Sequence, residues 1–233
     1  MLRNQSELLQ VLPLVQELLT ILSAPYNLNG REVYSTASIG VLLGNASYEK
    51  AEDVLRDADT AMYEAKHSGK SCFVVFDEGM RERASRRHRL EHDLHRVVEA
   101  GQLSLVYQPI MDLSSGGIHS IEVLCRWNHP TLGPISPLEF IPIAEDAGLI
   151  ANLTDWVIAT AFQEFVAWRR DLGATAPHLL CLNISSRQFG QNQWIDHLQD
   201  MLAKFQIAPN CLELELSERA IRDDLANATQ TLL

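Results

Sequence analysis

The sequence has no apolar run long enough to cross a membrane. Its longest apolar stretch, VLPLVQELLTIL, is interrupted by Gln, Glu and Thr and falls short of the ~20 apolar residues of a membrane-spanning helix. The first residues, MLRNQSELLQ, also lack the charged and then apolar segments of a signal peptide. We therefore expect a soluble, cytoplasmic protein without a membrane segment.

Cysteine is scarce, and no two cysteines have the C-x-x-C spacing of a zinc or redox motif. The four cysteines are far apart and lie mostly in apolar runs: Cys72, Cys125, Cys181 and Cys211. Such spacing favours buried free thiols over disulfides or zinc ligands.

Basic residues are few relative to acidic ones. The chain of 233 residues has 19 Lys and Arg against 30 Asp and Glu, which gives a formal net charge of -11. A general nucleic-acid surface needs a basic face, so we expect no nucleic-acid partner. A phosphate-bearing ligand would need a metal ion or a few arginines to hold it. Because 46% of the residues are hydrophobic, the chain can still form a substantial core.

The first part of the chain reads as a small α/β segment that ends in a polar helix. Periodicity and turn residues predict the following elements: a helix over 5–23, a strand over 31–43, a helix over 49–68 and a strand over 71–76. A long helix follows over about 79–100, with five arginines between Arg81 and Arg89. We interpret this basic run as a solvated interdomain helix in preference to a phosphate-binding patch.

After Gly101 strands and helices alternate, which is typical of parallel β/α units. The pattern predicts strands over 103–110, 118–126, 178–185 and 211–217, and helices over 137–147, 152–172, 191–205 and from about 221. In CLELELSE the leucines fall on one face of the strand and the acids on the other. A row of carboxylates is costly between two layers of helices, whereas it can line the interior of a closed barrel, so the pattern favours a barrel.

Four polar residues come late in successive strands of this segment: Glu122, Arg126, Asn183 and Glu215. In a TIM barrel the C-terminal ends of the strands converge on the active site. Two carboxylates and an amide oxygen suit Mg²⁺ or Mn²⁺, and the guanidinium of Arg126 can grip a phosphate. Each residue taken alone could equally be a cap or a surface group.

Residues 103–218 resemble the N-terminal half of an EAL domain, the cyclic-di-GMP phosphodiesterase family. The resemblance is carried by YQPIMDLSSGGIHSIEVLCRWNHPTLGPISPLEFIPIAEDAGLI, by LNIS and by LELELSE, although Val123 replaces the usual alanine of the name-giving motif. It implies metal ligands at Glu122, Asn183 and Glu215, for Mg²⁺ or Mn²⁺. It further implies a phosphate contact at Arg126, a substrate contact at Gln108, a loop-stabilising acid at Glu218, and a homodimer in the complete family member.

Residues 30–77 resemble the C-terminal half of a GGDEF domain, the diguanylate cyclase family, through YSTASIGV and RDADTAMYEAKHSGKSCFVVF. The resemblance implies remnant nucleotide-phosphate contacts at Lys66 and Lys70, although two lysines at a helix end can simply complement the helix dipole. We thus expect a partial GGDEF-like α/β sandwich over 1–77, a linker helix over 78–101, and an incomplete EAL-type TIM (β/α) barrel over 102–233.

The signature motif of the cyclases is absent, so we expect no diguanylate cyclase activity. The sequence ends at Leu233, before the aspartate pair, the lysine and the later glutamate that the EAL resemblance implies for catalysis. We therefore expect no complete catalytic set. We also expect an open half-barrel of four parallel strands that is poorly soluble or dimerises through its exposed edge.

Three hypotheses remain open at this point. The chain can be a piece of a metal-dependent phosphodiesterase that hydrolyses cyclic-di-GMP to the linear dinucleotide. It can be a non-catalytic module that binds cyclic-di-GMP or a protein partner. It can also be the product of a broken reading frame, with no function of its own.

Overall fold

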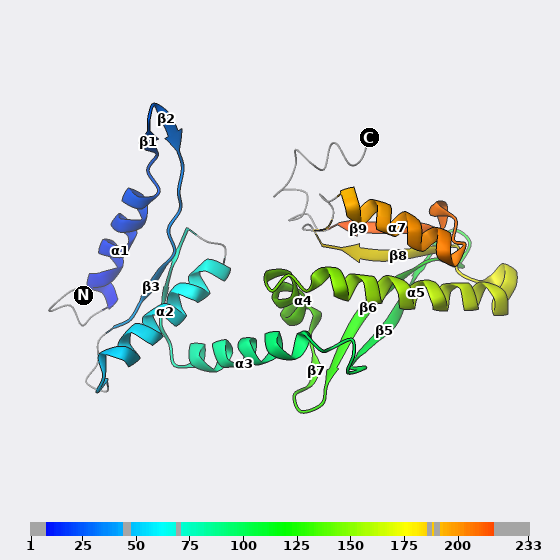
Figure 1. The fold of residues 1–233 in the computed structure, drawn as a ribbon, viewed down its shortest axis with the longest axis horizontal. Helices are drawn as coiled ribbons and strands as arrows, with labels where there is room; N and C mark the ends of the chain where they lie inside the picture. The colour runs from blue at the N-terminus through cyan, green and yellow to red at the C-terminus, as the bar shows by residue number, and fades with distance from the viewer. Residues whose placement is uncertain (1–7, 44–47, 69–70, 186–187, 189–191, 217–233) are drawn as a thin grey trace. The chain divides into compact units, whose positions relative to one another are not determined.

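The structure is a computed structural model that describes residues 8–43, 48–68, 71–185, 188 and 192–216. The chain divides into two compact units, Met1–His88 and Arg89–Leu233, which are described separately below. Both units combine helices with strands, as expected (Figure 1). Among the described residues, no helix is long and apolar enough to cross a membrane.

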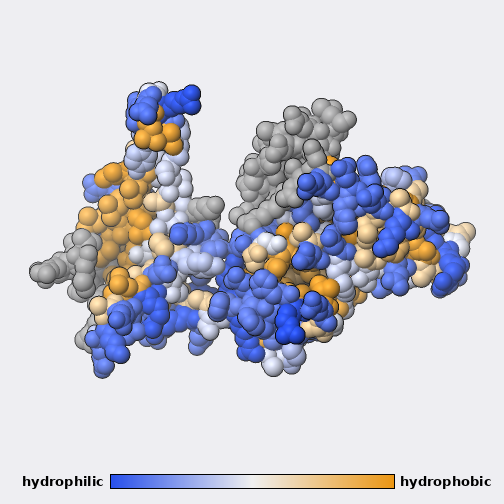
Figure 2. All heavy atoms as spheres, viewed as in Figure 1, coloured by the Kyte–Doolittle hydropathy of each residue, from blue (hydrophilic) through white to orange (hydrophobic). Residues whose placement is uncertain are grey.

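Unit 1 packs two helices against short strands. Its elements are α1 (Leu8–Leu22), β1 (Tyr26–Leu28), β2 (Arg31–Val33), β3 (Ile39–Val41), α2 (Ala51–His67) and β4 (Phe73–Val75), and α3 (Gly79–Leu94) begins within it. Strands β3 and β4 are parallel, and their side chains pack with Val11 and Val15 of α1 in a small core. Several apolar residues of α1 nevertheless remain exposed, and Figure 2 shows apolar surface over this helix.

The prediction of a single strand over 31–43 was wrong. The turn at Asn29 and Gly30, which both have positive φ, closes a hairpin in which β2 pairs with β1. The chain then leaves this hairpin, and β3 pairs with β4 instead. Because the two halves of the segment pair with different partners, they form two short strands.

Unit 2 contains a five-stranded sheet with the order β5-β6-β8-β9, and β7 pairs with β6. The strands are β5 (Leu103–Met111), β6 (Ile118–His129), β7 (Gly133–Ile135), β8 (Leu179–Ile184) and β9 (Leu212–Leu216). The helices are α4 (Pro137–Asp146), α5 (Ile150–Leu172) and α7 (Asn192–Phe205), with 3-10 turns at Gly173–Thr175 and Pro209–Cys211. These α-helices lie where the sequence pattern predicted them.

The expectation that all strands of this sheet are parallel was wrong for β5. Strands β6, β8 and β9 are parallel, but β5 is antiparallel to β6. The short segment 112–117 joins β5 to β6, and a parallel connection needs a crossover of a dozen residues or more. Strand β7 and the hairpin strand β1 were also not predicted, and α3 ends at Leu94 instead of near residue 100.

One face of the sheet is covered by helices. Leu180 and Leu182 of β8 pack with Phe162 of α5 and Leu198 of α7 in the largest core cluster. The leucines of β9 also contact this cluster, as the alternation in LELEL predicted. The opposite face therefore carries the other residues of each strand, among them the polar candidates.

The four cysteines are free thiols, as expected. Cys181 is fully buried, whereas Cys72, Cys125 and Cys211 are half-buried, so the expected burial is complete only at Cys181. Burial raises the pKa of the Cys181 thiol to about 11, which keeps it protonated at neutral pH.

Candidate functional site

A row of polar side chains crosses the face of the sheet that lies opposite α5 and α7. Gln108 of β5 pairs in register with Glu122 of β6, which pairs with Cys181 of β8, which pairs with Glu213 of β9. Paired residues of neighbouring strands project to the same face, so one row of side chains runs across the strands.

The next pair along the strands is Asn183 of β8 and Glu215 of β9. Each lies two residues beyond a member of the first row and therefore projects to the same face. The register thus brings Glu122, Asn183 and Glu215 to one face of the sheet, near the carboxyl ends of β8 and β9.

A direct contact links two members of this set. The side-chain amide of Asn183 donates to Oε1 of Glu122 at 2.8 Å. Glu122 is half-buried and Asn183 is exposed, so the contact is open to a ligand from the solvent side. The oxygen and nitrogen of an asparagine amide can exchange places by a flip, which would turn the Asn183 oxygen toward a cation beside Glu122.

Glu215 experiences an unfavourable charge environment. Burial raises the pKa of its carboxyl group, and the negative charges of Glu122 and Glu213 raise it further. Two neighbouring carboxylates that act on a half-buried third one leave an excess of negative charge, which a bound cation would offset. Hard oxygen donors of this kind suit Mg²⁺ or Mn²⁺.

Arg126 lies on the same strand and face as Glu122, four residues further along β6. Its guanidinium is half-buried, and Nη1 donates to the backbone oxygen of Cys125 at 3.0 Å. Within the described part of the chain its guanidinium forms no ion pair with a carboxylate. Its remaining donors are thus available to an anion.

The remaining predicted residues lie in unit 1 or outside the described residues. Lys66 is exposed in the last turn of α2, in unit 1, a position that suits the helix dipole. Glu218 and Lys70 lie outside the described residues, as does Ser217 beside Glu218. The described residues also contain no group of three or more His, Cys, Asp or Glu arranged to hold a metal ion. The candidate set contains only two such residues and an amide.

Sequence reasoning missed two further members of the polar face, Ser120 and Cys181, whereas the alternation in CLELELSE had already assigned Glu213 to the same strand face as Glu215. The thiol of Cys181 lies 3.3 Å from Oε2 of Glu213, and Ser120 is almost fully buried. The signal was the alternation itself, since Cys181 lies two residues before Asn183 and Ser120 two residues before Glu122. Cysteine and serine in an apolar strand read as core residues, which hid their position beside the acids.

Two family profiles match the chain. The EAL domain profile matches residues 91–233, and the profile of the diguanylate cyclase, GGDEF domain, matches residues 1–72.

The chain is similar to curated proteins that are named as a cyclic di-GMP phosphodiesterase, alone or together with a diguanylate cyclase. It is 34% identical over 221 residues to the bifunctional diguanylate cyclase/cyclic di-GMP phosphodiesterase MucR of Pseudomonas aeruginosa. It is 33% identical over 221 residues to the cyclic di-GMP phosphodiesterase NbdA of the same species. Both alignments cover 94% of this chain, but the chain spans only 32% of MucR and 27% of NbdA.

Solved structures support the same relationship. The MucR phosphodiesterase in complex with c-di-GMP matches with a TM-score of 0.57 and 33% identity, over 62% of this chain and 57% of that one. The EAL domain of FimX from Xanthomonas citri, in complex with c-diGMP, matches with a TM-score of 0.54 and 26% identity, over 65% of this chain and 58% of that one.

Proposed function

The chain belongs to the EAL domain family, with a GGDEF match ahead of the EAL match, and on this premise we propose that it acts in cyclic-di-GMP signalling. We assign a GGDEF-like part to 1–77, a linker to 78–101 and an EAL part to 102–233. The observation that carries the proposal is the shared face of Glu122, Asn183 and Glu215, with the Asn183–Glu122 contact and the raised pKa of Glu215.

In this proposal Glu122, Asn183 and Glu215 hold a divalent cation, Mg²⁺ or Mn²⁺. Their oxygen donors fit such an ion, and the excess negative charge around Glu215 favours it. A bound ion would supply positive charge and Lewis acidity at a phosphate. The flip of the Asn183 amide described above brings a third oxygen ligand.

The other candidates contact the cyclic dinucleotide. Arg126 binds one phosphate through a bidentate hydrogen bond, because a guanidinium matches the geometry of two phosphate oxygens. Gln108, exposed on β5 and paired with Glu122, contacts the ligand through its amide. Glu218 stabilises a catalytic loop of the complete family member, and Lys66 and Lys70 remain from a nucleotide-phosphate site.

The relatives named as phosphodiesterases suggest the chemistry of the whole protein, which is metal-dependent hydrolysis of cyclic-di-GMP to the linear dinucleotide. Because the chain spans about a third of MucR, binding is proposed for the chain itself and hydrolysis for the longer protein. A homodimer of the complete protein and a cytoplasmic location belong to the same proposal.

Calorimetric titration with cyclic-di-GMP in Mg²⁺, together with chromatography of the products, tests the proposal. We expect saturable binding that Glu122→Ala abolishes, because a metal ligand is lost. Arg126→Ala should weaken binding about tenfold, because one charged hydrogen-bonding group is lost. Glu17→Ala, at an exposed position of α1, is the matched control and should bind normally. Equal binding by Glu122→Ala and the wild type would overturn the site.

A further inference from the structure

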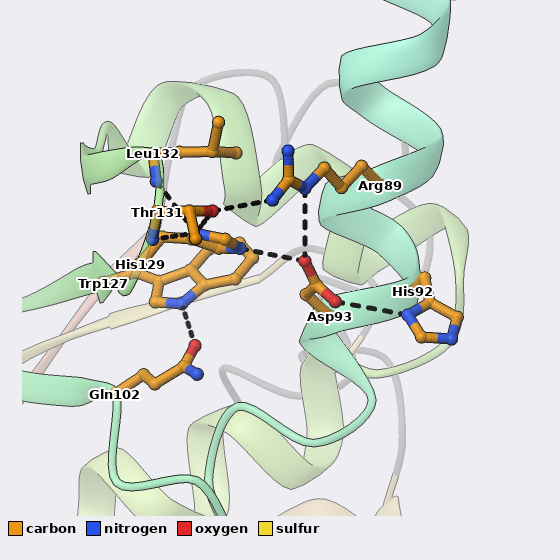
Figure 3. Close-up of polar contacts among 8 residues, drawn as sticks. All are labelled: Arg89, His92, Asp93, Gln102, Trp127, His129, Thr131 and Leu132. Atoms are coloured by element: carbon orange, nitrogen blue, oxygen red, sulfur yellow. Dashed lines mark hydrogen bonds and ion pairs between the residues drawn. The ribbon is translucent and has the colours of Figure 1, made fainter.

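A closed ring of four polar side chains joins helix α3 to the end of strand β6, within unit 2 (Figure 3). Its members are Arg89 and Asp93 of α3, His129 at the last position of β6, and Thr131 in the turn after it. Arg89 Nη2 donates to Thr131 Oγ1 at 2.7 Å, and its Nε lies 3.9 Å from Asp93 Oδ2. His129 Nε2 lies 2.9 Å from the same carboxylate oxygen.

The imidazole of His129 is held in one orientation and one tautomer. The His129 side chain is 3% exposed, and Nδ1 accepts hydrogen bonds from the backbone N–H groups of Thr131 and Leu132 at 3.2 and 3.1 Å. Because a backbone N–H can only donate, Nδ1 is the acceptor and Nε2 carries the proton, which it donates to Asp93. The hydrogen bond from His129 also holds the pKa of Asp93 below its usual range.

Apolar side chains pack beside this ring of four polar residues. Leu90 and Leu94 of α3 share a buried cluster with Trp127, whose indole is fully buried and lies 5.5 Å from the His129 ring. Trp127 Nε1 donates to Gln102 Oε1 at 3.0 Å, as Figure 3 shows. Helix α3 therefore contacts β6 at two nearby residues. Its leucines pack against the buried Trp127, and its Asp93 accepts a hydrogen bond from His129.

The attachment lies close to the proposed phosphate contact. Arg126 precedes Trp127 on the strand and pairs in register with Ser104 of β5. The register at this end is fixed by the pairs Leu103–Trp127 and Ser104–Arg126. The backbone N–H of Asn128 also donates to the backbone oxygen of Gln102 at 2.9 Å. A shift of the strand end would thus move the base of the Arg126 side chain, and small misplacements weaken phosphate binding.

We propose that Asp93 and His129 are positioning residues that fasten helix α3 to the end of strand β6 and so hold Arg126 in place at the phosphate site. This inference rests on the proposed function. The polar ring fixes the orientation of α3 relative to the end of β6 more closely than apolar packing alone, because hydrogen bonds require specific geometry. The latch, as we name the Asp93–His129 pair, makes ligand affinity depend on the position of α3.

Two substitutions of His129 distinguish its hydrogen bond to Asp93 from its hydrogen bonds to the backbone of the turn at Thr131 and Leu132. The carboxamide of asparagine reaches the position of Nδ1, so His129→Asn keeps an acceptor for the turn and loses the bond to Asp93. The longer glutamine reaches the position of Nε2, so His129→Gln keeps a donor to Asp93 and loses the turn acceptor. A latch requires the second variant to behave like the wild type, whereas a role confined to the turn requires the first.

Calorimetric titration of the full chain with cyclic-di-GMP in Mg²⁺ is the first measurement. We expect His129→Asn and Asp93→Ala each to raise the Kd about tenfold, without an additive effect in the double variant, and His129→Gln to stay within about twofold. The matched control is His197→Asn, because His197 forms an exposed pair with Asp155 at 3.2 Å between α7 and α5. A folding defect would lower the binding stoichiometry and leave the Kd unchanged.

Hydrogen exchange of the ligand-free chain is the second measurement, and it does not depend on the proposed function. We expect faster exchange over 124–129 in His129→Asn and Asp93→Ala, and wild-type exchange in His129→Gln and His197→Asn. A wild type that fails to bind cyclic-di-GMP would overturn the proposed function, and exchange would then decide on the latch. Unchanged exchange over 124–129 in both latch variants, or an unchanged Kd beside normal wild-type binding, would overturn the latch.

Discussion

Glu215 shows how a single residue can be unfavourable for the fold and useful for a site. An acid with a raised pKa binds its proton more readily in the folded state than in the unfolded state. Stability from this group is therefore gained as the pH falls through the raised pKa, and at neutral pH the ionised carboxylate is a cost. A bound cation would remove that cost.

Glu215→Gln should therefore stabilise the metal-free chain at pH 7, by roughly 1–2 °C in the melting temperature, and this gain should vanish below the usual pKa range of glutamate. The same variant should no longer gain stability from Mg²⁺ or Mn²⁺. Thermal melts between pH 4 and 7, with and without the ion, measure both effects. A metal-free variant that is less stable than the wild type at pH 7 would contradict this assignment of charge.

Asp57 in unit 1 is a second residue in which charge decides the energetics. Its carboxylate is fully buried, and it accepts hydrogen bonds from Tyr48 at 2.7 Å and from Arg81 Nε at 2.8 Å, with a second, shorter contact to Arg81 Nη2. These bonds, chiefly the one from Arg81, hold the pKa of Asp57 well below its usual range. The stability they supply is present above the usual aspartate pKa and is lost as the pH falls below it.

The two members of this pair should respond unequally to substitution. Asp57→Asn leaves a half-exposed arginine that can turn to solvent, so we expect a loss of about 1.5–3 kcal/mol that shrinks in acid. Arg81→Ala leaves a buried carboxylate with weaker partners, so it should cost more. Urea unfolding of unit 1 at pH 7 compares them. Asp57→Asn as the more damaging change would refute the argument.

At the level of elements, Gly40 permits the close contact between β3 and α2. A Cβ at this position would collide with the backbone of Ala58 and Met62, which helix α2 holds in place. We expect Gly40→Ala to destabilise unit 1 by about 1–3 kcal/mol, because backbone cannot yield as a flexible side chain does. Calorimetric melting should show a lower transition for unit 1 and an unchanged one for unit 2.

Gly117→Ala is the matched control, since its Cβ would lie at an ordinary 3.5 Å from the Ser115 hydroxyl and its φ is not positive. It should leave both transitions in place. A Gly40→Ala chain with wild-type melting would show that β3 and α2 are not packed as closely as the structure has them.

The elements also show which features the sequence predicts well. The α-helices α2, α4, α5 and α7 and the strands of LELEL and LLCLNI follow from strong periodicity, and alternation assigned Glu122 and Glu215 to one face. The antiparallel direction of β5 depends on the length of the 112–117 turn, which strand and helix alternation ignores. The split of 31–43 depends on pairing partners, which no local pattern contains. The two residues of the latch, Asp93 and His129, lie 36 positions apart in the sequence, so only the fold brings them together.

At the scale of the whole molecule, the described sheet of unit 2 has β5 at one end of its strand order. Several apolar residues of β5 are exposed, among them Val106, Ile110 and Met111. We expect the chain to self-associate through this edge, and Ile110→Lys to weaken the association because an edge charge disfavours strand pairing. Sedimentation equilibrium over a range of concentrations measures it. Leu138→Lys on α4, at a more exposed apolar position, should have no effect, and equal effects of both would argue against the edge.

The two units give the molecule separate roles in this account. Unit 2 carries the polar face and the latch, whereas the described part of unit 1 contributes the α2 terminus with Lys66 and the buried Asp57 pair. The chain spans about a third of MucR, and the property that we propose for the chain itself is binding at the polar face. The central claim is that Glu122, Asn183 and Glu215 hold one divalent cation there.

Titration with Mn²⁺, with free Mn²⁺ followed by electron paramagnetic resonance, tests this claim most directly. We expect a single ion-binding event per chain in the wild type and in Glu17→Ala, with the affinity for Mn²⁺ falling as the pH drops through the raised pKa of Glu215. We expect loss of that event in Glu122→Ala and in Glu215→Gln. Absence of binding in the wild type, or the same binding curve in all four proteins, would contradict the claim.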